Sequence, residues 1–174
     1  MDKTMVMDFL KTFASKRLSW LLLAGSAFML ELTAIYFQHV MSLQPCIMCV
    51  YERLVMVGLI SAGLIGCINP KQKYIRWPSF MLWGYSALQG VSLAKTHVYV
   101  QSNYTPETHC DLVPNFPSWI PLHEWMPWMF QPTGTCAEIA WQFLGLSMPQ
   151  WLVIIFSVYS ITFVVFLVPQ LLKR

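Results

Sequence analysis

The chain has few charged residues, since Asp, Glu, Lys and Arg together make up only 11% of its 174 residues. A soluble domain averages about 25%, so this composition does not suit a protein surrounded by water. The sequence has no long cluster of Lys and Arg, which excludes a typical nucleic-acid-binding surface. It also has no internal repeat and no low-complexity tract, and its length favours one integral membrane domain over residues 1–174.

Apolar residues dominate what is present: they make up 56% of the chain, and the mean hydropathy is +0.52. Crossing a bilayer takes about 20 apolar residues, and four segments qualify, at about residues 18–37, 50–68, 77–93 and 151–172. The first is too long for a signal peptide and lacks a small-residue cleavage site. We therefore predict an all-α membrane protein built as a four-helix transmembrane bundle.

The basic residues predict the orientation of the chain in the membrane. Nine of the 11 Lys and Arg lie before the first span, between the second and third spans, or after the fourth span: Lys3, Lys11, Lys16, Arg17, Lys71, Lys73, Arg76, Lys173 and Arg174. Short segments rich in Lys and Arg stay in the cytoplasm. We expect both termini to be cytoplasmic, and the connectors at about 38–49 and 94–150 to face the opposite, oxidising side.

The second exported connector is over fifty residues long and rich in proline, but part of it is too apolar for a solvated linker. The apolar positions are Trp119, Ile120, Leu122, Trp125, Met126, Trp128, Met129 and Phe130. We predict a short amphipathic helix that lies on the outer membrane surface. The alternative is a hydrophobic plug packed on the helix bundle.

Cys46 and Cys49 form a Cys-X-X-Cys pair at the start of the second span. Backbone N–H groups and the helix dipole favour a thiolate at a helix N-terminus. Arg53 follows Cys49 by four residues, so both can share one helical face. Its guanidinium could stabilise a thiolate or the negative charge on a reduced cofactor. The alternative role for Arg53 is an anchor at the headgroups, paired with Glu52.

The exported connectors hold four cysteines in all, because Cys110 and Cys136 lie in the second connector. Four cysteines permit three pairings, and Cys46–Cys49 with Cys110–Cys136 is the simplest. The alternatives are two structural disulfides or a four-thiolate zinc site, although the separation of 26 residues between Cys110 and Cys136 is poor for zinc and no metal is expected. A bridge across two residues restrains little chain, so the first pair is expected to be redox-active. Cys67 is expected to be a buried core residue.

Glu31 falls inside the first predicted span. A carboxylate within a bilayer is costly, and acids in such positions are functional candidates by default. We expect a protonated Glu31 bonded to a neighbouring helix near the exported end, with a role in proton supply as the alternative.

Several motifs together resemble one family. They are residues 44–53 (QPCIMCVYER), 31–34 (ELTA), 37–41 (FQHVM), 116–119 (FPSW), 136–138 (CAE), 143–146 (FLGL) and 148–151 (MPQW). In these motifs the chain resembles the bacterial disulfide-bond formation protein B (DsbB) family, and the resemblance covers nearly its whole length.

The resemblance implies a four-helix bundle in the bacterial inner membrane that reoxidises a periplasmic thioredoxin-fold oxidase (DsbA-like) and passes electrons to ubiquinone, with menaquinone as the alternative. It implies that Cys46 and Cys49 are the quinone-coupled pair and that Cys110 and Cys136 exchange with the protein partner. It also implies that Arg53, Cys49, His97 and Met148 line the quinone site. The alternative for His97 is an interfacial side chain bonded to a loop carbonyl.

We therefore expect a quinone-dependent thiol oxidase whose partners are a DsbA-like protein, membrane lipid and quinone, with no nucleic acid. Two rival hypotheses remain from the sequence. One is a non-enzymatic membrane scaffold whose disulfides only staple the loops. The other is a related oxidase dedicated to a narrower thiol partner.

Overall fold

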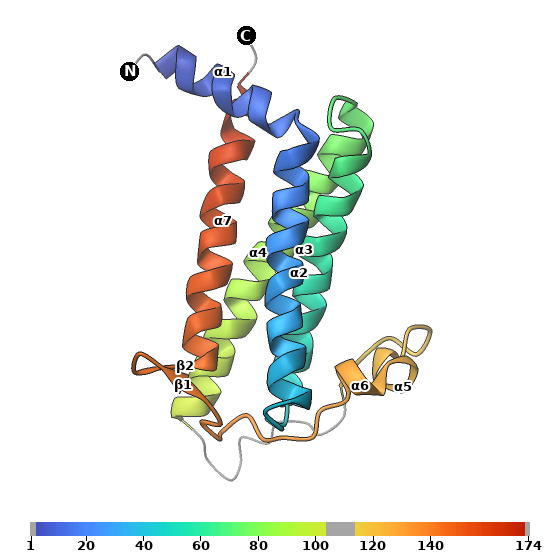
Figure 1. The fold of residues 1–174 in the computed structure, drawn as a ribbon, viewed down its shortest axis with the longest axis vertical. Coiled ribbons are helices and arrows are strands. Elements are labelled where there is room, and N and C mark those ends of the chain that lie inside the picture. Colours follow the sequence, from blue (N-terminus) through green and yellow to red (C-terminus); the bar gives the residue numbers. More distant parts are fainter. Residues whose placement is uncertain (1–2, 104–113, 173–174) are drawn as a thin grey trace.

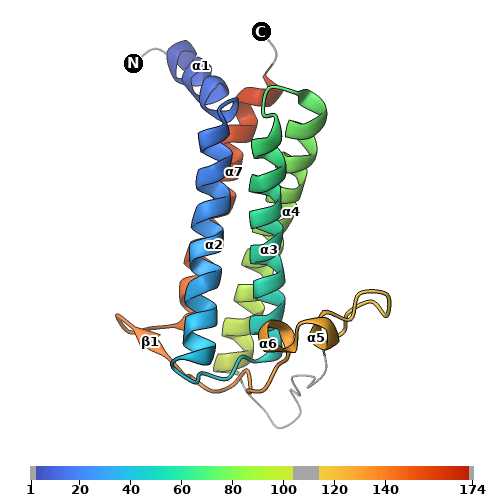
Figure 2. The ribbon, with the colours of Figure 1, turned by 45° about the vertical axis from the view of Figure 1, so that its right-hand side comes forward.

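The computed structural model describes residues 3–103 and 114–172, and four long helices form its body (Figure 1). These are α2 (Arg17–His39), α3 (Ile47–Ile68), α4 (Lys73–Ser102) and α7 (Met148–Leu171). α3 packs between α2 and α4, and α4 packs on α7. The four-helix bundle predicted from the sequence is therefore confirmed. α1 and the C-terminal end of α7 lie at one end of the bundle, and the connectors with the described site cysteines lie at the other end (Figures 1 and 2).

Of the described helices, α2, α3 and α7 are long and apolar enough to cross a membrane by length and composition. α4 is longer, with 30 residues, but it is less apolar because polar residues occupy both of its ends. It starts four residues before the predicted span 77–93 and continues nine residues beyond Leu93. Its last turns carry Lys95 and His97, so the helix extends past the apolar run from which the span was predicted.

A helix at the start of the chain was not predicted from the sequence. α1 (Lys3–Ala14) packs across the ends of α7 and α2. The ring of Phe13 stacks on Phe166 of α7, with centroids 5.5 Å apart. The Trp20 indole N–H donates to the Ala14 carbonyl at 2.9 Å and fixes the junction between α1 and α2.

The bundle core is rich in aromatic rings and closely approaching helices. Trp20 meets Phe80 edge to face at 5.0 Å, and Phe80 stacks on Trp83 at 5.9 Å. A Cβ added to Gly63 would lie 2.6 Å from the backbone N of Ala24. Because backbone cannot retreat like a flexible side chain, only glycine allows α3 to approach α2 this closely.

The long connector contains two short helices and a hairpin rather than one surface helix. α5 (Leu122–Trp125) and α6 (Pro127–Phe130) follow each other directly, and β1 (Gln142–Phe143) pairs antiparallel with β2 (Leu146–Ser147). The hairpin turn uses left-handed backbone at Leu144 (φ 52°) and Gly145 (φ 79°). The strands have two residues each, which is too short for an alternating pattern to reveal them.

The apolar segment of the connector has one face packed on the bundle and one exposed face. Met129 and Phe130 are buried against Val50 of α3, as expected of a plug on the bundle. Trp125 and Trp128 are 62% and 51% exposed, as expected of side chains that face the membrane interface. The segment is therefore an amphipathic element with one face fixed to the bundle.

Candidate functional site

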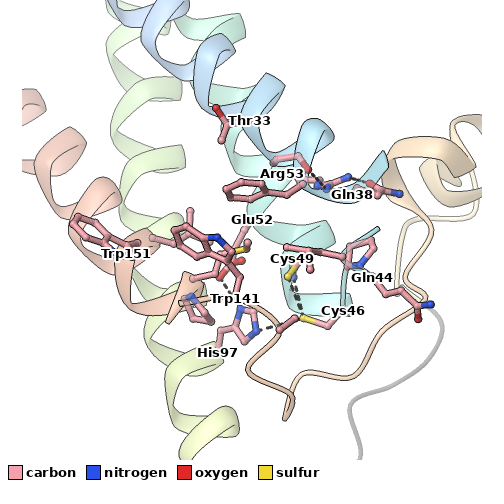
Figure 3. Close-up of a pocket in the computed structure, with 18 of the residues that line it drawn as sticks. Thr33, Gln38, Gln44, Cys46, Cys49, Glu52, Arg53, His97, Trp141 and Trp151 are labelled. Atoms are coloured by element: carbon pink, nitrogen blue, oxygen red, sulfur yellow. Dashed lines mark hydrogen bonds and ion pairs between the residues drawn. The ribbon is translucent and has the colours of Figure 1, made fainter. Parts of the chain in front are cut away.

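Cys46 and Cys49 lie at the N-terminus of α3, where Pro45 leads into the helix. Cys46 is the N-cap residue, and its sulfur accepts a hydrogen bond from the backbone N–H of Cys49 at 3.4 Å. The Cys46 thiol donates to the sulfur of Cys49 at 3.3 Å (Figure 3). The two sulfurs therefore need only a small movement to bond covalently, since a disulfide measures about 2.05 Å.

His97 and Glu52 form a buried chain of contacts behind the cysteine pair. His97 Nε2 is 3.4 Å from the sulfur of Cys46, and His97 Nδ1 is 3.1 Å from Glu52 Oε1 (Figure 3). Glu52 and His97 are both almost completely buried, with 3% exposure each. His97 thus bonds to a carboxylate and contacts a sulfur, rather than bonding to a loop carbonyl. Glu52 pairs with His97 on α4 and not with its neighbour Arg53.

Cys136 reaches the cysteine pair because backbone hydrogen bonds fix its segment in place. The N–H groups of Thr133 and Gly134 both donate to the Pro45 carbonyl, at 2.9 and 3.0 Å. Cys136 is buried in one cluster with Cys46. Hydrogen bonding to Cys136 and Cys49, together with burial, raises the pKa of the Cys46 thiol above its usual range. Cys110, the fourth predicted site cysteine, lies outside the described residues.

Gly134 is required by this contact between the loop and Pro45. A Cβ at this position would lie 2.5 Å from the backbone oxygen of Gln44. We predict that Gly134→Val displaces the segment and slows disulfide exchange between Cys136 and Cys46 by about 10–100-fold, the loss expected when a reacting group is held about 1 Å out of place. Rapid quenching with acid and alkylation of the thiols would follow this exchange.

The matched control is Gly145→Ala, where an added Cβ meets nothing within 4 Å although the backbone is left-handed. This substitution strains the backbone of the same connector but away from Pro45, so exchange should remain near the parent rate. Equal exchange rates in the Gly134→Val variant and the parent would show that the Pro45 contact does not position Cys136.

Arg53 is buried, with 6% exposure, and its guanidinium joins three parts of the chain. It donates to the Met129 carbonyl at 2.8 Å, to the Ala34 carbonyl at 3.1 Å and to the Gln38 side-chain oxygen. Its Nε lies 3.9 Å from Glu31 Oε1. A headgroup anchor would be exposed, so this environment favours a role inside the site. Glu31 faces a neighbouring helix, α3, as expected, but among the described residues it does so through an ion pair with Arg53 and not through the hydrogen bond expected of a protonated carboxyl group.

A cavity of about 730 Å³ connects these residues. Cys49, Arg53, His97 and Met148 all line it, so the structure brings together these four predicted site residues. Its apolar walls are Leu30, Phe37, Met56, Trp141, Trp151, Leu152 and Ile155. The oxygens of Glu31, another lining residue, have no hydrogen-bond partner in the part of the chain that the structure describes. The volume, and walls that are mostly apolar with polar groups among them, are typical of a site for a small molecule.

A second, almost entirely apolar cavity of about 550 Å³ adjoins the first. The two share Leu30, Trp151 and Ile155, and the second lies between α2, α4 and α7. Its lining includes Leu22 and Val158, which are 56% and 57% exposed on the outer side of the bundle. α2 and α7 are bridged there by the Tyr159 hydroxyl, which donates to Ser26 at 2.9 Å. The cavity therefore faces the lipid between these two helices.

Comparisons with known proteins agree with the site. The family described as Disulfide bond formation protein DsbB matches residues 16–166. The chain belongs to the DsbB family. It is 55% identical to Disulfide bond formation protein B of Psychromonas ingrahamii over 97% of this chain and 91% of that protein. It is 52% identical to the protein of the same name from Aeromonas salmonicida, over 97% of each.

As a DsbB family member the chain is a membrane protein of disulfide bond formation and an oxidoreductase, which confirms the family resemblance found in its motifs. Sequence reasoning missed several residues that build this DsbB site: the Pro45 carbonyl, Gln38, Gly134 and Trp141. None belongs to a residue type that signals redox chemistry. Their roles arise from contacts between segments 15 to 104 residues apart, the longest being the ring contact of Trp141 with Phe37.

Proposed function

We propose that the chain oxidises a periplasmic dithiol protein of the DsbA type and passes the electrons through two cysteine pairs to ubiquinone. The observation that carries the proposal is that Cys46 and Cys49 both lie on the wall of the large cavity, while Cys46 is also buried in one cluster with Cys136. The Cys46–Cys49 pair thus borders the cavity that opens toward the lipid, and it also borders the connector with Cys136 that would meet a soluble protein.

The proposed orientation follows from the charges and the fold together. The described basic residues of α1 and of the α3–α4 connector lie at the end of the bundle opposite Cys46 and Cys49. Short basic segments remain in the cytoplasm. The protein would therefore cross the bacterial inner membrane several times, with both termini cytoplasmic and the cysteines on the periplasmic side.

The first part of the reaction is thiol–disulfide exchange at the loop. A thiolate of the partner attacks the Cys110–Cys136 disulfide, most directly at Cys110, and Cys136 leaves as a thiolate. Cys136 then attacks Cys46 of the Cys46–Cys49 disulfide, and Cys49 leaves as a thiolate. The Pro45 contact supports this step because it holds the Cys136 segment beside Cys46. The second thiol of the partner then attacks the partner sulfur bonded to Cys110, which releases the oxidised partner and a Cys110 thiolate. This thiolate attacks Cys136 in the Cys136–Cys46 disulfide, which re-forms Cys110–Cys136 and frees Cys46 as a thiol.

The second part takes place at the cavity wall. The buried Arg53 cation lies on the same cavity wall as Cys49 and would stabilise negative charge there. His97, oriented by Glu52, is placed to take the proton of Cys46 as the Cys46–Cys49 bond re-forms. Two thiols thereby lose two electrons and two protons and become one disulfide.

The lining of the cavity fits a quinone. Arg53 and His97 supply polar groups for ring oxygens, while Phe37, Trp141 and Met148 supply apolar contact. A bound quinone would accept the two electrons and two protons and become a quinol. The adjoining apolar cavity suits a prenyl tail, since it leads from the site toward the lipid.

The test is thiol oxidation by the purified chain in lipid nanodiscs with a reduced DsbA-type protein. We expect turnover only when ubiquinone is supplied, with one quinol formed for each disulfide, measured by ultraviolet absorbance and by thiol titration. Menaquinone and other thioredoxin-fold proteins can be compared in the same assay, which separates a broad from a narrow partner range. Absence of turnover with every quinone and every partner would favour the structural scaffold.

A further inference from the structure

We propose that the reduced Cys46–Cys49 pair and His97 form a binding site for a thiophilic divalent cation of the Zn²⁺ type, and that an ion bound there blocks reoxidation of the pair. The sequence argued against zinc because the four exported cysteines have poor spacing for a four-thiolate site. The third ligand instead comes from α4, 48 residues beyond Cys49, so no spacing along the chain could reveal it.

The geometry of the three ligand atoms supports the site. The two sulfurs and a His97 ring nitrogen all lie within 4.8 Å of one another. A tetrahedral zinc ion needs sulfurs roughly 3.8 Å apart and a sulfur–nitrogen distance of roughly 3.5 Å. The observed distances are 3.3 Å between the sulfurs and 3.4 Å from Cys46 to His97 Nε2. Shifts of about half an ångström would bring these two distances to the tetrahedral values, and the third distance, from the Cys49 sulfur to the His97 ring nitrogen, lies within 4.8 Å.

Glu52 supports His97 as metal sites usually require. A metal-bound histidine commonly donates its second ring N–H to a carboxylate, which fixes the ring and strengthens the ligand. Here Glu52 Oε1 is 3.1 Å from Nδ1 of His97, leaving Nε2 directed at Cys46 (Figure 3). Glu52 and His97 are both buried, so packing already holds the two side chains in this arrangement without the ion.

The charges balance when the ion binds. Two thiols lose two protons, and the two thiolates neutralise the dication, which leaves no net charge added to the buried site. A fourth position remains open for water. The disulfide form offers no thiolates, so only the reduced pair can bind, and the proposed function supplies that form from the dithiol partner. The ion would hold the pair reduced because both sulfurs are engaged.

The direct test is titration of the full chain, reduced and freed of reductant under argon, with Co²⁺ as a spectroscopic substitute for Zn²⁺. We expect one Co²⁺ per chain, with thiolate charge-transfer absorption and the visible bands of a tetrahedral ion, displaced by Zn²⁺. The same chain with its pair oxidised is the matched control and should show neither band. This control does not depend on any substitution being tolerated.

Variants then assign the ligands. Glu52→Gln should weaken Zn²⁺ binding by about 10–100-fold, the usual effect of losing the partner of a metal-bound histidine. His97→Ala removes a ligand itself and should weaken binding by more than about 100-fold. Cys110→Ser with Cys136→Ser should keep the site, and Cys67→Ser should bind like the parent. Loss of binding in the Cys110/Cys136 variant, with parent affinity in His97→Ala, would place the ion elsewhere and overturn the proposal. So would an absence of binding by the reduced parent at micromolar concentrations.

The consequence for activity rests on the proposed function, and the two can fail separately. Quinone turnover measured with a chelator present tests the oxidase alone. If turnover occurs and the reduced chain binds no metal, the metal site is wrong and the oxidase stands. If metal binds and no quinone is reduced, the oxidase is wrong. If quinone turnover and metal binding both occur, Zn²⁺ should inhibit turnover and the chelator should restore it. Turnover that bound Zn²⁺ does not change would refute the proposed inhibition of reoxidation.

Discussion

Replacing Cys49 with serine is expected to reduce quinone-dependent thiol oxidation to below about a thousandth of the parent rate, as for other essential nucleophiles. Cys46 and Cys49 both line the large cavity together with Arg53, and Cys46 is also buried in one cluster with Cys136. Without the Cys49 sulfur the pair cannot form its disulfide, so no electrons can leave toward the cavity. Quinol formation by the purified variant in nanodiscs is the measurement.

The matched control for this prediction is Cys67→Ser, which removes a thiol of the same helix α3. Cys67 packs at the edge of the bundle core and lines neither cavity. Its replacement should leave quinol formation near the parent rate. Membrane insertion should be unchanged in both variants. A Cys49→Ser protein that reduces quinone as fast as the Cys67→Ser protein would rule out the proposed electron route.

Replacing Arg53 with methionine is expected to lower the free energy of unfolding by about 3–5 kcal/mol, the usual cost of breaking a buried ion pair. The change leaves Glu31 without its cation and removes donors from the carbonyls of Met129 and Ala34. These groups belong to α2 and α6, so the variant should loosen both from α3. Unfolding in mixed micelles, followed by tryptophan fluorescence, would measure the loss.

A double substitution separates the charge of Arg53 from its hydrogen bonds. Glu31→Gln added to Arg53→Met removes the uncompensated carboxylate and should recover part of the lost stability. Arg53→Lys keeps the charge, but its N–H groups all leave one nitrogen and cannot match acceptors that bond two separate guanidinium nitrogens. We therefore expect this variant to fall between the parent and Arg53→Met. Should Arg53→Met unfold at the parent midpoint, the network around Arg53 does not hold the helices together.

The long apolar runs predicted most of the bundle. Within the membrane the backbone N–H and C=O groups of each span must form hydrogen bonds with one another, which requires a helix. Apolar length identifies where a helix crosses, but it does not identify where the helix ends. α4 therefore runs nine residues past the predicted end at Leu93. α1 escaped prediction because its basic residues were interpreted only as an orientation signal. The hairpin at Leu144 and Gly145 depends on left-handed backbone at both residues. Only glycine commonly adopts that conformation, so the sequence indicates it at Gly145 and not at Leu144.

The candidate site was predictable to the extent that its residues carry distinctive chemistry. The Cys-X-X-Cys pair and its place at a helix start followed from the sequence, and so did the closeness of Arg53 to Cys49. The residues that pair with Glu52 and Arg53 did not follow from the sequence. Adjacent residues on a helix do not face each other, so Glu52 and Arg53 point to different helices and pair with His97 and Glu31. Such pairings depend on how the helices pack, which hydropathy does not specify.

The apolar cavity between α2 and α7 determines how an acceptor would arrive. Because exposed side chains such as Leu22 and Val158 border it, an acceptor can enter from the bilayer sideways without passing through water. The concentration of acceptor that the protein encounters is then the mole fraction of the acceptor in the lipid, and not its concentration in the whole sample volume. Diluting the same protein and quinone with more phospholipid should slow turnover even though nothing in the aqueous phase has changed.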